Sequence, residues 1–118
     1  MAKDRLRPED APVTPEQISI FIERGHFVFR TGNSLAIYFS DKDEAGKSNC
    51  NAACAAMWPP VATTRANTTV VGDWTVIDRA DKSRQWAYKG KPVYTFAHDE
   101  AGQIKGEAAQ PGWHVLKP

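Results

Sequence analysis

The stretch Y-F-S-D-K-D-E-A-G, residues 38–46, decides the architecture because it returns 56 positions later as Y-T-F-A-H-D-E-A-G, residues 94–102. Five residue types recur at this one offset, and each copy runs on to a tryptophan, Trp58 in the first and Trp113 in the second. Self-similarity at a fixed period is the signature of a repeated supersecondary unit. The sequence therefore predicts two copies of one unit rather than a single irregular fold.

The residues around each copy have the pattern of antiparallel strands joined by polar turns. Each copy contributes three such segments: 18–22, 26–30 and 35–39 in the first, and 74–77, 84–88 and 93–96 in the second. A three-stranded sheet with one apolar face needs a cover, and two copies can cover each other. We predict an all-β domain of two three-stranded meanders, at about 18–60 and 74–116, packed as a small sandwich or open barrel.

Two segments have helical signals within this β pattern. Residues 14–17, T-P-E-Q, fit a capping box with proline at the first helical position, so 15–24 is open to a helix. The following β-branched and aromatic run, 18–22, favours a strand instead. Good helix formers between 48 and 58 predict a short helix or turn near 50–57.

Length and composition limit the class of protein. A chain of 118 residues with net charge +1 fits one domain and has no basic stripe to indicate nucleic-acid binding. Residues 1–13 are charged and proline-containing, so we predict a flexible arm there and a single domain over 14–118. Apolar stretches reach only about five residues, too few to span a membrane. The first ten residues lack an apolar leader region, which leaves a cytosolic protein or one whose leader was removed.

The two cysteines, Cys50 and Cys54, are spaced C-x-x-x-C. On a helical turn, residues i and i+4 share a face, so the two sulfur atoms are neighbours. A structural disulfide in an oxidising compartment is the favoured interpretation. Two free thiols, a redox-active pair, and part of a metal site completed by distant histidines stay open as alternatives.

The tyrosine and aspartate of each copy invite a catalytic interpretation, but a structural one accounts for them. Tyr94 and Phe96 are two positions apart on one strand face and belong in a core, as does Tyr38. Asp43 and Asp99 follow the strand ends, where a carboxylate accepts backbone N–H bonds and holds the turn.

Other chemistry has little support in the sequence. Residues 41–46 resemble the start of a calcium loop, but alanine stands at its fifth and twelfth positions. No phosphate-binding glycine loop and no nucleophile elbow occurs, so we predict no enzyme and no cofactor. The metal candidates fit no ligand spacing and need the fold to assemble them: His26, His98 and His114.

Several segments are similar, in the same order, to a known family: 41–60, 72–77, 85–92 and 112–115. Over about residues 26–118 the chain resembles the bacterial secreted-repeat lipoproteins with a Y-x-[FWY]-x-x-D motif, a family of unknown function. The second copy carries the motif intact from Tyr94 to Asp99. The first copy has Ser40 at the aromatic position, which predicts unequal roles for the two copies.

The resemblance implies a periplasmic, cell-surface or secreted protein whose leader, with or without a lipid anchor, was trimmed. It supplies no activity. We therefore expect a non-enzymatic extracytoplasmic module that binds a protein or a cell-envelope ligand through exposed aromatic side chains, the candidates being Trp58, Trp74 and Trp113. The alternative is a periplasmic metal- or haem-binding or redox protein that uses His with Cys or Met.

Overall fold

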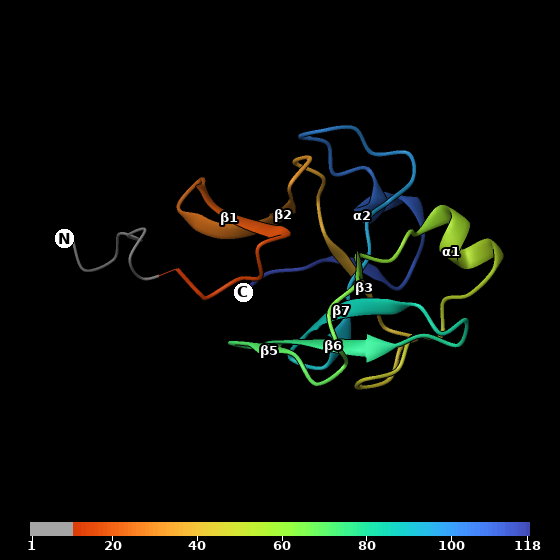
Figure 1. Ribbon diagram of the computed structural model, residues 1–118. Helices are drawn as coiled ribbons and strands as arrows, with labels where there is room; N and C mark the ends of the chain where they lie inside the picture. The colour runs from red at the N-terminus through yellow and green to blue at the C-terminus, as the bar shows by residue number, and fades with distance from the viewer. Residues whose placement is uncertain (1–10) are drawn as a thin grey trace.

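The computed structural model describes residues 11–118, in which antiparallel strands predominate and the two helices are short (Figure 1). The elements are β1 (Ile18–Glu23), β2 (His26–Thr31), β3 (Tyr38–Ser40), α1 (Ala53–Met57), β4 (Ala62–Thr63), β5 (Val70–Val71), β6 (Trp74–Asp78), β7 (Arg84–Tyr88), β8 (Lys91–Pro92), α2 (Gly106–Ala109) and β9 (Trp113–Val115). The prediction of an all-β fold is confirmed, and these strands close no barrel. Most of the predicted arm, residues 1–10, lies outside the described residues.

The second copy forms a three-stranded meander, but its third strand is β8 at Lys91–Pro92, and the predicted strand 93–96 is reduced to bridges at Tyr94. β7 pairs with β6 on one side and with β8 on the other, and β4 and β5 extend the sheet to five strands. Alternation explains the strands: Trp74 and Val76 are buried on one face of β6, and Trp86 and Tyr88 on one face of β7.

The first copy begins with a hairpin, in which β1 pairs with β2 along all six residues of each strand. Residues 18–23 are therefore a strand, and only a turn at 16–17 remains of the helical alternative. The turn between the strands is Arg24-Gly25, both with positive φ, as a two-residue hairpin requires. The third predicted strand is reduced to one bridge, Arg30 to Ala36, before the chain leaves to form β3.

The first copy departs from a full meander because β3 pairs with the other copy. Tyr38 and Tyr94, which are equivalent in the repeat, exchange two backbone hydrogen bonds: Tyr38 N donates to Tyr94 O at 2.8 Å, and Tyr94 N donates to Tyr38 O at 2.9 Å. β3 also pairs with β9 at the end of the second copy. The two copies thus form a shared β structure rather than two separate sheets.

Further backbone hydrogen bonds between the copies occur in equivalent pairs. They are Val61 N to Val93 O with Leu116 N to Ile37 O, Gly46 N to Gly90 O with Gly102 N to Ser34 O, and Ala97 N to Met57 O with Asp41 N to Gly112 O. Each bond has a counterpart about 56 positions away with the copies exchanged. The repeat therefore has approximate two-fold symmetry, and each copy satisfies backbone groups of the other.

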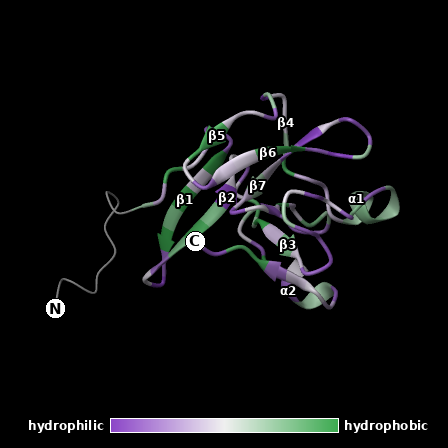
Figure 2. Cartoon of the chain, turned by 90° about the horizontal axis from the view of Figure 1, so that it is seen from below, coloured by the Kyte–Doolittle hydropathy of each residue, from purple (hydrophilic) through white to green (hydrophobic). Residues whose placement is uncertain are grey.

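The core has two parts. One lies between the five-stranded sheet and the β1–β2 hairpin, whose strands are largely hydrophobic in Figure 2. The other lies between the two copies and is rich in aromatic rings: Ala36, Tyr38, Cys50, Trp58, Tyr94, Phe96 and Trp113. At its centre Trp58 and Trp113 stack in parallel with ring centroids 3.9 Å apart. The tryptophans that end each copy therefore join the copies.

Candidate functional site

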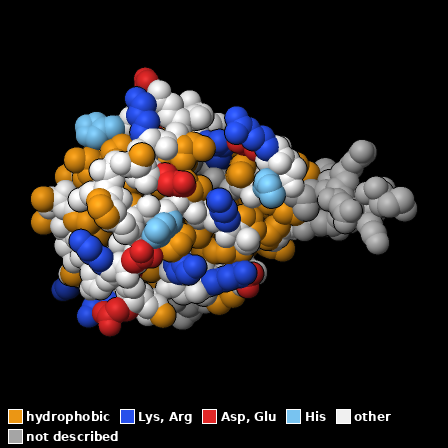
Figure 3. Space-filling model, turned by 180° about the vertical axis from the view of Figure 1, so that it is seen from behind, with side chains coloured by type: hydrophobic (Ala, Val, Ile, Leu, Met, Phe, Trp, Pro, Cys, Tyr) orange, Lys and Arg blue, Asp and Glu red, His pale blue; other side chains and the backbone are white. Residues whose placement is uncertain are grey.

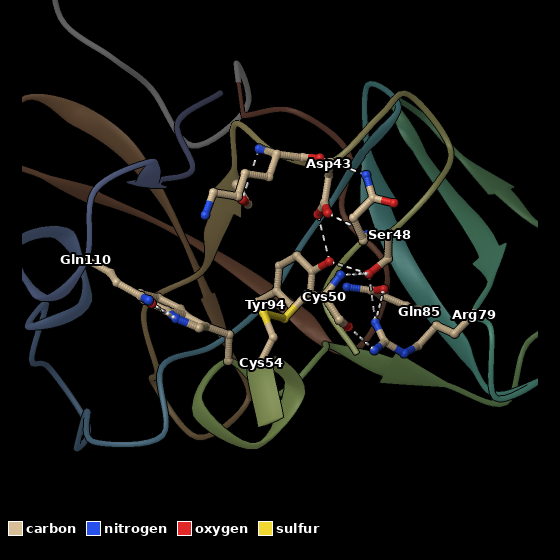
Figure 4. Close-up of a disulfide and its surroundings, with 12 residues drawn as sticks. Asp43, Ser48, Cys50, Cys54, Arg79, Gln85, Tyr94 and Gln110 are labelled. Atoms are coloured by element: carbon tan, nitrogen blue, oxygen red, sulfur yellow. Dashed lines mark hydrogen bonds between the residues drawn. A yellow bond between two sulfur atoms is a disulfide. The ribbon is translucent and has the colours of Figure 1, made fainter. Parts of the chain in front are cut away.

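The disulfide between Cys50 and Cys54 stands at the start of α1 and confirms the favoured interpretation of the cysteines (Figure 4). The two Cα atoms are 5.1 Å apart, and Cys50 is buried. No free thiol remains, so the chain has no thiolate for a metal. The predicted short helix near 50–57 is α1, which follows Cys50 and ends just before Trp58.

A cavity of about 670 Å³ opens beside this disulfide. Its walls come from both copies and include Ser40, Lys42, Asp43, Asn49, the disulfide, Met57, Trp58, Phe96, His98, Gln110 and Trp113. Rings and sulfur atoms form an apolar floor, while amide, imidazole and carboxylate groups stand around it. Met57 is 40% exposed, which makes it the large apolar side chain of the cavity most open to solvent.

The cavity lies where the two copies differ. In the second copy Phe96 packs on Trp58, with ring centroids 4.6 Å apart. The equivalent pair is Ser40 and Trp113, which lie opposite each other in β3 and β9. Because serine is far smaller than phenylalanine, it leaves space beside Trp113, and Ser40, Phe96 and both tryptophans line the cavity. The lack of an aromatic side chain at position 40 thus creates part of the cavity.

The motif tyrosines are bonded to aspartates of the opposite copy. Tyr38 donates its hydroxyl to Asp99 Oδ2 at 2.5 Å, and Tyr94 donates to Asp43 Oδ2 at 2.7 Å. Each aspartate also accepts a backbone N–H six residues further on, from Asn49 and Lys105, both at 2.7 Å. Each carboxylate therefore fixes the loop that follows it and also binds the tyrosine of the other copy. We did not predict this contact between the copies, although the sequence shows that the two tyrosines, like the two aspartates, are 56 positions apart.

A buried polar network runs from Asp43 into the protein interior (Figure 4). The Tyr94 hydroxyl lies 2.5 Å from Ser48 Oγ, which accepts from Arg79 Nη1 at 3.1 Å. Arg79 also donates to Gln85 Oε1 at 2.8 Å and to Cys50 O at 2.5 Å. Arg79 is 6% exposed, and among residues 11–118 no carboxylate lies within 4.0 Å of its guanidinium group.

This network links the cavity wall to the disulfide loop. Asp43 lines the cavity, and Arg79 holds the carbonyl of Cys50 from behind. Sequence reasoning missed Ser48, Arg79 and Gln85, because a polar residue in a turn or strand gives no sign of burial. The equivalent positions in the other copy are occupied by Ile104, Glu23 and Phe29, so the repeat gave no guide either.

The network predicts a pH dependence. Burial raises the pKa of Tyr94 to about 12; the Ser48 hydrogen bond opposes this shift, and Asp43 adds to it. A raised pKa means that the native state keeps a proton that the unfolded chain loses near pH 10, so stability falls as pH rises from about 10 to 12. Absorbance titration at 295 nm should show phenols ionising above pH 10. Tyr94→Phe should remove part of this component, and its persistence at full amplitude would contradict the assignment.

The prediction that the candidate tryptophans are exposed is wrong. Trp58, Trp74 and Trp113 are 1%, 0% and 6% exposed, because stacking between the copies and packing under the sheet bury them. Trp58 and Trp113 reach a ligand only as the floor of the cavity. Trp74 lies in the other core against Phe29, and its Nε1 is the one buried side-chain nitrogen or oxygen in residues 11–118 without a hydrogen-bond partner.

The histidines are not brought together. His26, His98 and His114 are exposed and line three different cavities, and His114 Nε2 lies 2.8 Å from Asp41 Oδ2. Within residues 11–118 no group of three His, Cys, Asp or Glu side chains is placed to hold a metal ion. Positive and negative side chains are interspersed on the face shown in Figure 3.

Residues 75–117 match the model of a family described as a secreted repeat of unknown function. The matched range covers the second copy from β6 to β9, so the match confirms the family resemblance for that copy. No curated protein and no solved structure matches the chain. No helix within residues 11–118 is long and apolar enough to cross a membrane.

Proposed function

We propose, from the match of residues 75–117 to a secreted repeat family, that this protein is a non-enzymatic extracytoplasmic module. It binds a protein or a cell-envelope ligand in the cavity beside Cys50 and Cys54. A disulfide persists in oxidising compartments, which agrees with a place outside the cytoplasm. Periplasmic and cell-surface positions are both compatible with this function.

The observation that carries the proposal is the cavity between the copies. Ligand sites are concave, mostly apolar, and bear a few polar groups that orient the ligand. Here the floor is held rigid by the stacked tryptophans and the disulfide, while Asn49, Gln110 and His98 supply hydrogen-bonding groups. Gln110 is already fixed, because its Oε1 accepts from Trp58 Nε1 at 2.8 Å.

Met57 is the residue that we expect a ligand to contact first. Its thioether is flexible and adapts to irregular apolar surfaces, and 40% of the residue faces solvent at the cavity. A glutamate at position 57 would place a charge on a surface that must lose its water when the ligand binds. Val70 in β5 is a matched control, since it is an apolar residue, 67% exposed and outside the cavity lining.

The test is co-sedimentation of the purified protein with isolated bacterial cell envelope, before and after protease treatment of the envelope. Wild type and Val70→Glu should sediment equally, whereas Met57→Glu should lose most of the bound fraction. Loss after protease treatment assigns a protein ligand, and retention assigns another envelope component. Equal sedimentation of Met57→Glu and wild type, or none by wild type, would refute the proposed site.

A further inference from the structure

The outer edge of β1 is a long strand edge without a partner. β1 pairs only with β2, and within residues 11–118 no strand lies on its other side. Proteins protect such edges with lysine, proline, bulges or a covering segment. The sequence of β1, I-S-I-F-I-E, has no lysine or proline and a single charge, Glu23, at its end. The hairpin packs on the five-stranded sheet through its inner face but is not hydrogen-bonded into it (Figure 1).

The hairpin turn determines which backbone groups face outward. A two-residue turn at Arg24-Gly25 makes Glu23 and His26 the first hydrogen-bonded pair. Hydrogen-bonded and non-hydrogen-bonded pairs then alternate along the ladder. The N–H and C=O groups of Ile20 and Ile22 therefore point away from β2. Ile18 fits this pattern, because its N–H donates to Pro15 O rather than to β2.

Apolar side chains are exposed along the same edge. Phe21 is 45% exposed and Ile22 is 41% exposed, although both lie within the regular strand β1. Phe21 stands opposite Val28 on the face of the hairpin turned away from Ile18 and Phe29. A partner along the edge would satisfy the free backbone groups and cover both side chains.

We propose that the partner is a second copy of this chain, paired antiparallel along β1 with Phe21 opposite Phe21 of the second copy. In this register Ile20 faces Ile22 of the second copy and Ile22 faces its Ile20, so all free backbone groups of these two residues pair. The arrangement is a closed two-fold interface in which the same strand serves both copies. Cross-strand aromatic pairs at non-hydrogen-bonded positions stabilise a sheet.

The charges favour this antiparallel arrangement. It places the two Glu23 side chains at opposite ends of the interface, whereas a parallel arrangement would put them side by side. Each Glu23 is already paired within its own copy, where its two carboxylate oxygens accept from Arg30 at 3.0 Å each. The antiparallel interface therefore brings no unpaired charge to the apolar centre of the strand.

The first measurement is sedimentation velocity of the full chain over a concentration series with the disulfide intact. Wild type should shift from monomer to dimer as concentration rises. Phe21→Lys should remain monomeric at concentrations where wild type is a dimer, and Val70→Lys should behave as wild type. A wild type that stays monomeric throughout, or a dimer that Phe21→Lys leaves intact, overturns the proposal.

The second measurement tests the register by cross-linking. Opposed non-hydrogen-bonded residues have Cα atoms about 4.5 Å apart, within the range of a disulfide. Phe21→Cys should therefore form an intermolecular disulfide on mild oxidation, much faster than Val70→Cys, whose side chain is more exposed. Equal rates for the two variants would show that β1 edges do not meet.

Discussion

Replacing Arg79 with alanine is expected to lower the free energy of unfolding by about 2–6 kcal/mol, because two buried acceptors lose their partner at about 1–3 kcal/mol each. The acceptors are Gln85 Oε1 and the carbonyl oxygen of Cys50. The Ser48 hydroxyl loses one bond but keeps Tyr94 as a partner. The change should appear as a lower urea midpoint at unchanged slope.

The control is Arg84→Ala, the same substitution at an exposed position. Arg84 pairs with Asp78 at 3.3 Å, and the two side chains are 40% and 52% exposed. Exposed ion pairs contribute little, so this variant should be nearly as stable as wild type. Arg79→Lys should lose much of the stability of wild type, because a single ammonium cannot reproduce the fork that reaches three acceptors. Equal midpoints for Arg79→Ala and Arg84→Ala would contradict a structural role for the network.

Gly106→Ala is expected to lower the free energy of unfolding by about 1–3 kcal/mol through overpacking. A Cβ atom at this position would lie 2.8 Å from Cζ of Tyr38 and 2.9 Å from two ring atoms of Trp58. Those rings form the centre of the aromatic core between the copies, so neither moves without disturbing the other. The Gly106 N–H also donates to the Tyr38 hydroxyl at 3.1 Å.

The matched control is Gly32→Ala. Gly32 has no positive φ, and nothing lies within 4 Å of an added Cβ atom. Alanine there should leave stability unchanged or raise it slightly, because it restricts the unfolded chain. Denaturation of the two variants side by side separates crowding at Gly106 from the general effect of losing a glycine. A Gly106→Ala variant as stable as Gly32→Ala would mean that the close approach of the rings is not essential.

Gly106 also shows why the copies differ at the disulfide. Cys50 occupies the equivalent position in the first copy, 56 residues earlier. In the second copy the backbone must lie against Tyr38 and Trp58, which only glycine allows. In the first copy the position has space for a side chain, and Cys50 uses it to bond with Cys54. The same place in the repeat is thus a close contact in one copy and a cross-link in the other.

Much of the fold could be predicted because the signals were local. Alternation along 84–88 and the β-branched run at 18–22 indicated strands, and both segments are strands. The four-position separation of the cysteines, which places them on one face of a helical turn, favoured their bond. By contrast, no local sequence pattern indicated that β3 pairs with β9 or that Trp113 stacks on Trp58. These contacts join residues far apart in sequence, and many partners would satisfy the same pattern.

By itself, the sequence determined the repeat and the β class, favoured the disulfide and indicated a family resemblance, because periodicity and residue type act over a few neighbours. Only the tertiary structure decided that the motif tyrosine of each copy bonds to the aspartate of the other. It also decided that the tryptophans are buried and that a cavity opens beside Ser40. Those outcomes depend on how two similar units fit together, and the fit is set by the few positions where they differ.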